Sequence, residues 1–400
     1  RPAGAGRPQR NIAAGAIAVA RPQESYRGTF TRLRKTGPTR VVARDAGKPK
    51  NLVVILLEST RADAITPYEP ELQTTPFLAR FAKESVLVER GYAVVPHTSK
   101  ALVAIFCGFE PEVNLNLIEA EPDGLPGSCL PRLLAQAGYD TAFFQAPTGR
   151  FEKRATLVKN LGFRYFRSGD DVRRTAGLQR INYFGFEDAI MLAPSKTWLE
   201  RKRDRPIFAT YLTNASHHPY GVPTTHKAKR FDEDPVKNKY LNAVRYVDGV
   251  VEQIIDQYKA AGLYDETVFL IVGDHGEAFG EHGLLVHDDV MYEEVLHIPM
   301  LLRLPRAERA GQRIPGPVSE LSLAPTLLDV LGFDYGKPGE HYEGDTWFSR
   351  PREPVLFASC YRGERCAALI RDPHKLIYGF DELPPELYDL VRDPEETQDL

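Results

Sequence analysis

Apolar residues recur along this chain in two alternating patterns. Short continuous apolar runs predict buried strands, at LVVILL 52–57, TAFFQ 141–145, IFATYLT 207–213, VFLIVG 268–273 and PMLLRL 299–304. Between them, apolar residues spaced by three or four positions predict amphipathic helices, at 74–85, 130–138, 237–261 and 321–332. Strands that alternate with helices predict an α/β fold with a large, mostly parallel central sheet.

The pattern changes after about residue 353. The stretch PVLFASCYRGERCAALIRDPHKLIYG contains several short strand-like runs separated by turn residues, and such runs predict a small antiparallel sheet. We therefore expect three parts, which are a leader at 1–50, an α/β core at 51–352 and a C-terminal small-sheet subdomain of the same fold at 353–400.

Composition and charge narrow the possible partners. The 400 residues are 42% hydrophobic and 26% charged, which is enough for a large core. The net charge of −3 hides an asymmetry, because residues 1–50 carry twelve Lys or Arg against two acidic residues, about +10, which leaves about −13 for the remainder. The globular part is therefore not expected to bind nucleic acid. A basic leader rich in Pro and Gly fits either a disordered linker or a segment just outside a membrane anchor.

The start of the chain bears on the membrane question. The first residue is Arg1 rather than Met, so we expect a processed or shortened chain whose N-terminal anchor is missing. The apolar stretch NIAAGAIAVA at 11–20 has only about half of the roughly 20 residues that cross a bilayer. The residues given are therefore expected to form a soluble domain.

Four cysteines are too few to define a disulfide scaffold, namely Cys107, Cys129, Cys360 and Cys366. Cys360 and Cys366 flank the turn sequence YRGER. They form a disulfide if the protein is exported, or remain buried thiols. The cysteines alone do not decide between these alternatives.

Two of the predicted strands end on residues that bind metals. Glu58 follows the 52–57 run, and Asp274 and His275 follow the 268–273 run. Because ligands of parallel sheets bind in the crevice beyond the carboxyl ends of the strands, we expect these side chains to meet there. Two carboxylates and an imidazole are suitable ligands for a divalent cation.

The segment PHTSKALVAIFCGFEP adds a hydroxyl group. It predicts a helix that opens at Thr98 and Ser99 and ends at Gly108. A hydroxyl at a helix start is commonly a cap for free backbone N–H groups. The three candidate metal ligands favour a second interpretation, in which Thr98 is a fourth ligand and a nucleophile, because a bound cation lowers the pKa of an oxygen ligand. Free N–H groups at the helix start, for instance those of Ser99 and Lys100, would then face a bound phosphoryl group.

These motifs resemble those of the alkaline phosphatase superfamily, in its sulfatase-like branch, from residue 51 to residue 400. LESTRAD followed by QTTPFL is similar to the opening of phosphoethanolamine transferases and lipoteichoic acid synthases, GDHGEAFGEHGLLVH to their later block, and ELYDLVRDPEETQDL to the sulfatase ending. The resemblance implies a three-layer α/β/α sandwich of the alkaline phosphatase type. It also implies metal ligands at Glu58, Asp274 and His275 and a phosphate contact at His287.

The same resemblance distinguishes between branches of the superfamily. Sulfatases oxidise a Cys or Ser in a C/S-x-P-x-R motif to formylglycine, whereas the corresponding stretch here is TSKAL, beginning at Thr98. Thr98 stands ten residues before Gly108, which is the spacing of the Thr nucleophile in the phosphotransferase and nucleotide phosphodiesterase branches. The resemblance therefore implies phosphoryl transfer rather than formylglycine chemistry.

Two further segments resemble the lipoteichoic acid synthase group. GYDTAFFQAPTGRFEKRATLVKNLGF implies a substrate-binding Arg at Arg154, but Glu152 replaces the neighbouring aromatic residue that lines the glycerol-phosphate pocket in that group. LTNASHHPY is similar to LTNHFPF, which implies that His217 donates a hydrogen bond or a proton to the leaving oxygen. From the residues alone, the pair of His217 and His218 also fits a structural loop.

Other polar residues near these motifs are weaker candidates. Arg61 and Lys100 either contact an anionic substrate or are solvated, and Glu277 is expected to orient His275 or a backbone amide. The remaining candidates are interpreted as structural, with no second metal site expected, and they are Asp63, His282, Asp288 and His297.

Together these residues predict a metal-dependent phosphotransferase that acts on a phosphodiester of the lipid head-group or glycerol-phosphate type through a covalent phosphothreonine. Arg154 and His287 are expected to hold the non-bridging oxygens, and His217 to protonate the departing alcohol. Two alternatives remain. One is a sulfatase-like hydrolase of phosphodiester, phosphonate or sulfate esters, and the other is a non-catalytic binding module.

The expected cofactor is one divalent ion. Resemblance to lipoteichoic acid synthases implies manganese, and resemblance to phosphoethanolamine transferases implies zinc. The expected partners are an anionic ester such as a phospholipid, and a membrane reached through the missing N-terminal anchor. We therefore expect the soluble domain on the extracytoplasmic face of a bacterial membrane, in the periplasm or at the cell surface.

Overall fold

The computed structural model describes most of the chain. The described residues are 38–44, 49–113, 116–125, 127–171, 177–201, 204–336, 341–348, 356–361, 365–379 and 384–400. Most of the predicted leader lies outside them, so the role of the leader stays a prediction. Within these ranges, no helix is both long enough and apolar enough to cross a membrane.

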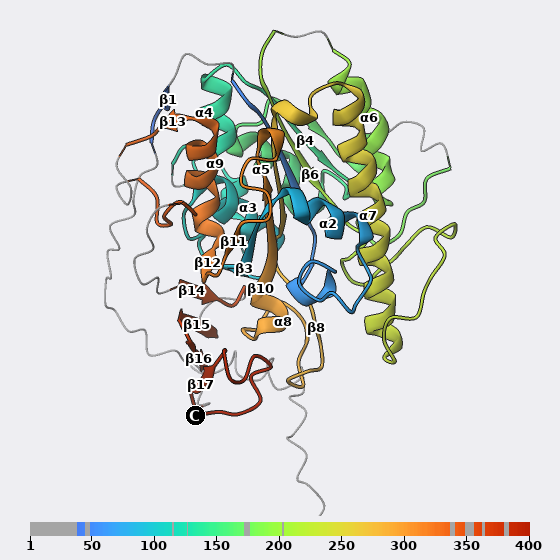
Figure 1. The fold of residues 1–400 in the computed structure, drawn as a ribbon, viewed down its shortest axis with the longest axis vertical. Helices are drawn as coiled ribbons and strands as arrows, with labels where there is room; N and C mark the ends of the chain where they lie inside the picture. The colour runs from blue at the N-terminus through green and yellow to red at the C-terminus, as the bar shows by residue number, and fades with distance from the viewer. Residues whose placement is uncertain are drawn as a thin grey trace, which may run out of the picture.

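A nine-stranded sheet forms the centre of the described structure (Figure 1). Its strands, in spatial order, are β11 (Arg313–Ile314), β3 (Val86–Tyr92), β10 (His297–Arg303), β7 (Thr267–Gly273), β2 (Asn51–Leu57), β6 (Ile207–Leu212), β4 (Asp140–Gln145) and β5 (Tyr165–Arg167), and β12 (Val318–Ser319) also pairs with β3. The five predicted strands are confirmed as β2, β4, β6, β7 and β10.

One strand of this sheet runs against the others. β10 pairs antiparallel with both β3 and β7, whereas the remaining strand pairs of the described sheet are parallel. The prediction of a mostly parallel sheet is confirmed. β3 is not among the predicted strands, because Glu89 and Arg90 interrupt its apolar residues.

Helices cover both faces of the sheet and give three layers, as predicted (Figure 1). On one face lie α3 (Thr98–Cys107), α4 (Leu130–Gln136), α5 (Arg154–Leu161) and α9 (Leu323–Leu331), and on the other lie α2 (Pro76–Phe81), α6 (Leu192–Leu199) and α7 (Pro235–Ala260). In β2, Leu52 and Val54 pack into the first core, and Val53 and Ile55 pack into the second. A strand that is buried on both faces is apolar at nearly every position. For this reason the sequence of β2 is one continuous run of apolar residues after Asn51.

A smaller antiparallel sheet follows the core, which confirms that prediction. Its strands, in order, are β14 (Leu356–Ser359), β15 (Cys366–Arg371), β16 (His374–Gly379) and β17 (Glu386–Asp389). Figure 1 shows it below the central sheet, near α8 (Glu293–Leu296). Two short antiparallel pairs complete the fold, β1 (Val42–Ala43) with β13 (Phe333–Asp334) and β8 (Ala278–Phe279) with β9 (Leu285–Val286).

The four cysteines form two disulfides, Cys107–Cys129 and Cys360–Cys366. The first joins the last residue of α3 to the residue before α4. For Cys360 and Cys366, the disulfide alternative is the one found. Cys107 and Cys129 lie 22 residues apart, and no turn motif between them pointed to their pairing.

A buried ion cluster joins the small sheet to the core. Lys375 of β16 is fully buried, and its Nζ lies 2.9 Å from a carboxylate oxygen of Glu293 in α8 and 2.9 Å from one of Glu396. Burial raises the pKa of Glu396 to about 7, against the opposing attraction of Lys375. A buried charge that loses its partner is strongly destabilising, so the docking of the small sheet depends on this cluster.

Replacing Lys375 with Met is expected to lower the free energy of unfolding by about 3–5 kcal/mol, because Glu293 and Glu396 then lose their counter-charge. Urea denaturation of the two proteins measures the difference. The matched control is Lys259→Met, which removes an exposed pair with Asp256 and is expected to change stability by less than about 1 kcal/mol. Equal losses for the two variants would contradict this account of the cluster.

Candidate functional site

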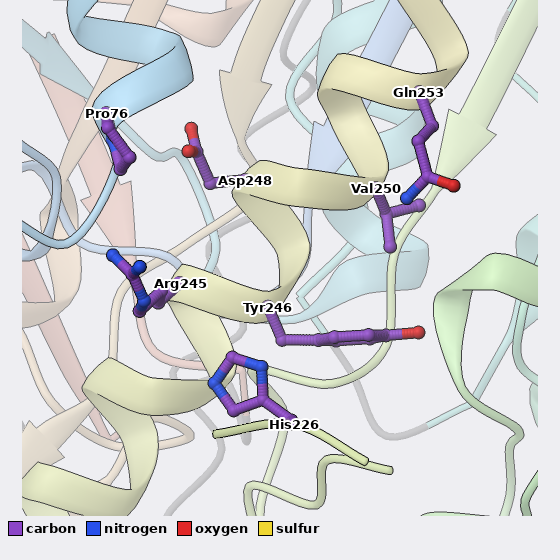
Figure 2. Close-up of a pocket in the computed structure, with 7 residues that line it drawn as sticks. All are labelled: Pro76, His226, Arg245, Tyr246, Asp248, Val250 and Gln253. Atoms are coloured by element: carbon purple, nitrogen blue, oxygen red, sulfur yellow. The ribbon is translucent and has the colours of Figure 1, made fainter. Parts of the chain in front are cut away.

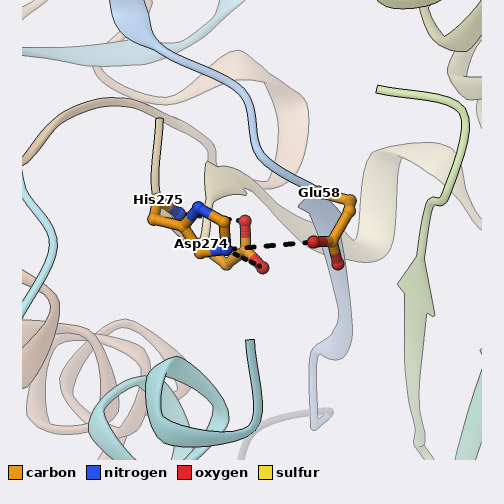
Figure 3. Close-up of side chains that lie close together, drawn as sticks. All are labelled: Glu58, Asp274 and His275. Carbon is orange, nitrogen blue, oxygen red and sulfur yellow. Dashed lines mark hydrogen bonds and ion pairs between the residues drawn. The ribbon is translucent and has the colours of Figure 1, made fainter. Parts of the chain in front are cut away.

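The three predicted metal ligands meet at one edge of the central sheet. Glu58 follows Leu57 at the end of β2, and Asp274 and His275 follow Gly273 at the end of β7. Leu57 and Gly273 are register partners in the parallel pair, so the two strand ends lie side by side. Figure 3 shows the three side chains converging, and one possible ligand atom from each lies within 4.8 Å of the others.

Backbone hydrogen bonds leave one buried atom unpaired on two of these ligands. Asp274 Oδ1 accepts from the N–H groups of Ser59, at 2.8 Å, and His275, at 2.9 Å. His275 Nδ1 lies 2.9 Å from the carbonyl oxygen of Gly276, so Nδ1 carries the proton and Nε2 keeps a lone pair. Asp274 Oδ2 and His275 Nε2 lie 3.6 Å apart and have no hydrogen-bond partner in the described structure. An anionic oxygen and an imidazole lone pair so arranged fit a bound cation.

The pKa shifts of the ligand cluster also agree with a site for a bound cation. Burial raises the pKa of Glu58 well above its usual value, and the Asp274 carboxylate raises it further. Burial lowers the pKa of His275 to about 4, so the ring is neutral near pH 7. The two carboxylates repel each other, and a divalent cation between them would reverse that repulsion.

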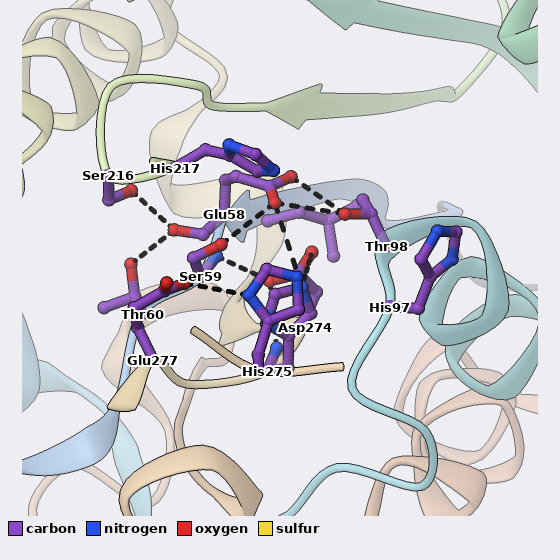
Figure 4. Close-up of polar contacts among 12 residues, drawn as sticks. Glu58, Ser59, Thr60, His97, Thr98, Ser216, His217, Asp274, His275 and Glu277 are labelled. Atoms are coloured by element: carbon purple, nitrogen blue, oxygen red, sulfur yellow. Dashed lines mark hydrogen bonds and ion pairs between the residues drawn. The ribbon is translucent and has the colours of Figure 1, made fainter. Parts of the chain in front are cut away.

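Thr98 is the first residue of α3, but it does not cap the helix. His97 occupies the N-cap position, with φ −162°. Thr98 Oγ1 lies 3.0 Å and 3.2 Å from the two carboxylate oxygens of Glu58 and donates a hydrogen bond to them. The cap interpretation is therefore wrong. Figure 4 shows the Thr98 hydroxyl directed at Glu58, next to Asp274 and His275.

Lys100 and Arg61 were expected either to contact an anionic substrate or to be solvated, and the structure shows neither arrangement. The N–H of Lys100 donates to the carbonyl oxygen of His97 at 3.0 Å, so this group does not face a substrate. Lys100 Nζ is buried 2.7 Å from Glu119, and Arg61 is buried 2.6 Å from Glu281. Both cations are buried and form ion pairs with carboxylates outside the ligand cluster, and only the Lys100 pair is buried on both sides.

His287 extends the site beyond the ligand cluster. Its ring centroid lies 4.1 Å from that of His275 and 6.0 Å from that of His217. Its Nδ1 lies 2.9 Å from Glu277 Oε2. Burial lowers the pKa of His287, but the Glu277 carboxylate outweighs burial and raises it overall. The expectation that Glu277 orients His275 or a backbone amide is wrong, since its two carboxylate oxygens lie 2.9 Å from His287 Nδ1 and from the Tyr220 hydroxyl.

His217 keeps one ring nitrogen for proton exchange. Its Nδ1 lies 2.8 Å from the carbonyl oxygen of His218 and so carries a proton. Burial and the nearby His287 lower its pKa, so the ring is neutral near pH 7 and Nε2 accepts a proton before it can donate one. Phe184 packs against the ring at 4.7 Å between centroids, which fixes its orientation.

Arg154, the predicted substrate-binding residue, begins α5 and is 3% exposed. Its Nη2 donates to Glu152 at 3.0 Å, whereas Nε and Nη1 are buried without a partner among the described residues. Glu152 also accepts from Ser99 Oγ at 2.6 Å, and its other oxygen lies 2.8 Å from His97 Nε2. The ring of Tyr361 stacks on His97 with centroids 3.6 Å apart.

Sequence reasoning missed two of these residues. His97 directly precedes Thr98, so its position was a signal that could have been used. Tyr361 follows β14 in the C-terminal part, and nothing in the sequence connects it with His97.

The residues interpreted as structural do make structural contacts. His282 stacks on Tyr292 with centroids 3.7 Å apart, and His297 Nε2 lies 2.9 Å from the carbonyl oxygen of Glu89. Asp63 binds Arg61. Asp288 lies nearer the site, 3.7 Å from His287 Nε2.

A separate pocket of about 230 Å³ lies against α7 (Figure 2). It is lined by Pro76, His226, Arg245, Tyr246, Asp248, Val250 and Gln253. The Asp248 carboxylate accepts from the N–H groups of Phe77 and Leu78, at 2.9 Å each, so it anchors the start of α2. This pocket contains none of the predicted site residues.

The loop that carries His217 is held by a buried carboxylate. Asp188 is fully buried, and its Oδ2 accepts from the N–H of Ala215 at 3.1 Å. Ser216 Oγ donates to the carbonyl oxygen of Glu58. Burial raises the pKa of Asp188 to about 7. The position of His217 therefore depends on a group that titrates near neutrality.

Asp188→Asn is expected to make stability less sensitive to pH. Because its pKa is raised in the folded state, Asp188 binds a proton more tightly when the protein is folded. Its contribution to the free energy of unfolding is therefore complete below about pH 4 and is lost as pH rises through about 7. The loss is about 1.4 kcal/mol per pH unit. Asn keeps the acceptor for Ala215 without the charge. Melting temperatures at pH 5 and pH 8 should therefore differ less in Asp188→Asn than in the wild type. In the control Asp256→Asn, an exposed site, the difference should be unchanged, and a wild-type-like difference in Asp188→Asn would refute the assignment.

Comparison with known proteins adds a family match. The family described as Sulfatase matches residues 50–333. The chain is 23% identical over 325 residues to the lipoteichoic acid synthase-like protein YvgJ of Bacillus subtilis, which covers 77% of this chain and 51% of that protein. The chain spans about half the length of the curated relatives it matches.

Solved structures show the same fold. A protein in the alkaline phosphatase superfamily from Vibrio parahaemolyticus matches with a TM-score of 0.73 at 20% identity, over 92% of this chain and 85% of that one. The lipoteichoic acid synthase LtaP from Listeria monocytogenes matches with a TM-score of 0.66 at 18% identity, over 89% of this chain and 92% of that one. The fold is therefore that of the alkaline phosphatase superfamily.

Proposed function

We propose that this chain, which belongs to the sulfatase family, is a metal-dependent phosphotransferase that works through a covalent phosphothreonine. The observation that carries the proposal is the contact of the Thr98 hydroxyl with Glu58, 3.0 Å apart. Beside it lie two buried ligand atoms that have no hydrogen-bond partner among the described residues. The stretch that begins at Thr98 lacks the C/S-x-P-x-R motif, which favours a threonine nucleophile over formylglycine.

The proposed cofactor is one divalent ion held by Glu58, Asp274 Oδ2 and His275 Nε2, with Thr98 Oγ1 as the fourth donor. When bound, such an ion supplies positive charge that lowers the pKa of a neighbouring hydroxyl. Two carboxylates, one hydroxyl and one imidazole form an oxygen-rich set that suits manganese, while zinc binds such sets more tightly in the general order of affinities. Both ions are therefore candidates.

The proposed reaction begins with an in-line displacement at phosphorus. Thr98 Oγ1 releases its proton to solvent and bonds to phosphorus, and the bond from phosphorus to the leaving alcohol oxygen breaks. Arg154 and His287 hold the non-bridging oxygens, where transition-state charge collects. His217 Nε2 takes up a proton from solvent and delivers it to the leaving oxygen. This order agrees with a ring that is neutral at rest.

A second displacement completes the transfer. An acceptor alcohol gives its proton to His217, and its oxygen bonds to phosphorus as the bond from phosphorus to Thr98 Oγ1 breaks. Thr98 Oγ1 then regains a proton from solvent, and His217 holds the proton that the next leaving alcohol receives. The similarity to proteins named as lipoteichoic acid synthases supports an alcohol as acceptor and a phosphodiester of the lipid head-group or glycerol-phosphate type as donor. Water in place of the alcohol would give a hydrolase.

That hydrolase is the second candidate function. The family description Sulfatase favours esterase chemistry on phosphodiester, phosphonate or sulfate esters, and the same residues would serve it. A non-catalytic binding module fits less well, because Glu58, Asp274 and His275 still form a complete ligand cluster.

We also propose that the chain acts at the extracytoplasmic face of a bacterial membrane. Two disulfides are typical of an oxidising compartment, and the basic leader suits an anionic surface. Phospholipid esters there would provide the anionic substrate.

Asp274→Asn and His275→Ala are each expected to lower bound metal from about one ion per chain to less than about a tenth, because loss of one ligand from such a small set weakens affinity strongly. Elemental analysis after purification without chelator measures this and identifies the ion. Asp288→Asn, which changes a carboxylate 3.7 Å from His287, is the control and should retain the ion. Full occupancy in Asp274→Asn would contradict the assigned ligands.

Incubation with phospholipids of different head groups should add a mass increment to Thr98, because the proposed intermediate is covalent. Intact and peptide mass spectrometry measure the increment and identify the transferred group. Thr98→Ala should carry no increment and lose at least about a thousandfold in turnover, whereas Thr98→Ser, which keeps a hydroxyl, should still be labelled. Turnover by Thr98→Ala at the wild-type rate would show that another group is the nucleophile.

A further inference from the structure

The site contains an ionised carboxylate that the proposed reaction does not use. Glu152 is 18% exposed and is bound by Arg154, Ser99 and His97, at 3.0, 2.6 and 2.8 Å. Burial raises its pKa, but the hydrogen bond and charge of His97 and the charge of Arg154 outweigh burial and hold the pKa far below its usual range. Glu152 therefore carries a full negative charge next to the residue proposed to bind substrate.

The backbone holds Glu152 in an unusual conformation. Glu152 and Lys153 have φ of 51° and 50°, in the left-handed region that residues other than glycine rarely adopt. Such a conformation persists only where surrounding contacts determine it. Here those contacts are the bonds of the Glu152 carboxylate, so the charge is placed at a fixed point.

The field of this carboxylate reaches the metal ligands. Glu152 accepts a hydrogen bond from Ser99, the residue that follows Thr98, and the Thr98 hydroxyl in turn donates to Glu58. An anion bound by Nε and Nη1 of Arg154 would lie in the same field. Glu152 offsets the charge of Arg154, so a second negative charge on that anion would gain less attraction than it would beside an uncompensated Arg154.

We infer that Glu152 is a specificity-determining residue, which selects singly charged tetrahedral esters over doubly charged phosphate monoesters. The selected class comprises phosphodiesters and sulfate monoesters, which share a single negative charge. This inference rests on the proposed function, because it takes the anion to bind at Arg154 beside Thr98. An uncharged residue at this position would leave the Arg154 charge uncompensated and would favour the doubly charged esters.

The competing explanation is that Glu152 only positions Arg154. The ratio of the affinities for a doubly and a singly charged anion distinguishes this role from charge selection. If Glu152 only holds Arg154 in place, its loss weakens the binding of all anions equally. If the charge of Glu152 selects between anions, its loss removes about twice as much repulsion from a doubly charged anion as from a singly charged one. The ratio of the two affinities therefore reports charge selection alone.

The test uses metal-loaded protein and two tetrahedral anions without ester bonds, so that neither is turned over. Methylphosphonate at pH 8.5 carries two negative charges, and dimethylphosphinate carries one. Titration calorimetry should show that Glu152→Gln shifts the affinity ratio about tenfold towards methylphosphonate. Glu152→Asn, which tolerates the left-handed conformation better, should give the same shift if the Gln variant folds poorly. Glu121→Gln removes a carboxylate that is exposed and paired with Lys153, and as the matched control it should leave the ratio unchanged.

Turnover of chromogenic esters distinguishes the two members of the selected class. Wild-type kcat/KM for bis(4-nitrophenyl) phosphate and for 4-nitrophenyl sulfate identifies which one is used, and the preference of either over 4-nitrophenyl phosphate should fall about tenfold in Glu152→Gln. An unchanged ratio in Glu152→Gln, or an equal shift in Glu121→Gln, would overturn the inference. Failure of the proposed function is separate, since it would show as an absence of any adduct on wild-type Thr98.

Discussion

The parallel pairing of β2 with β7 is the constraint on which the site depends. It places the end of one strand, with Glu58, against the end of the other, with Asp274 and His275. Two carboxylates are thereby buried together, which is unfavourable until positive charge compensates them. Arg154 contributes a positive charge near this edge, and the Glu277 carboxylate raises the pKa of His287. Under the proposed function, a divalent cation would compensate the two carboxylates, and an anionic ester would bind beside it.

Fixed contacts hold this edge of the sheet in place. The N–H of Glu58 donates to Thr213 Oγ1 at 3.0 Å, and Tyr240 donates to the carbonyl oxygen of Ser59 at 2.9 Å. Tyr220 donates to Glu277 at 2.9 Å, which in turn orients His287. Groups that directly follow regular strands and are held by such contacts have a fixed orientation. The site is therefore pre-organised before substrate arrives.

The sequence predicted those parts of the structure in which neighbouring residues carry the signal. β2 and β7 are continuous apolar runs that end directly on the ligands, so both the strands and Glu58, Asp274 and His275 were accessible. β3 was missed because Glu89 and Arg90 break its apolar run. The local cap rule does not apply to Thr98, and the contact of Thr98 with Glu58, forty residues away, could be expected only once both were considered as parts of one site. The partner of Glu277 and the pairing of Cys107 with Cys129 were out of reach for the same reason, since each contact depends on how distant segments pack.

The stacking of Tyr361 on His97 places a residue of the C-terminal part next to the contacts of Glu152. His97 lies 2.8 Å from Glu152, so an aromatic ring from beyond β14 supports the Glu152 carboxylate through His97. If Glu152 selects substrates as proposed, a change in the C-terminal segment would alter which ester is accepted while Glu58, Asp274 and His275 stay the same. Two proteins with the same ligand cluster could then differ in substrate.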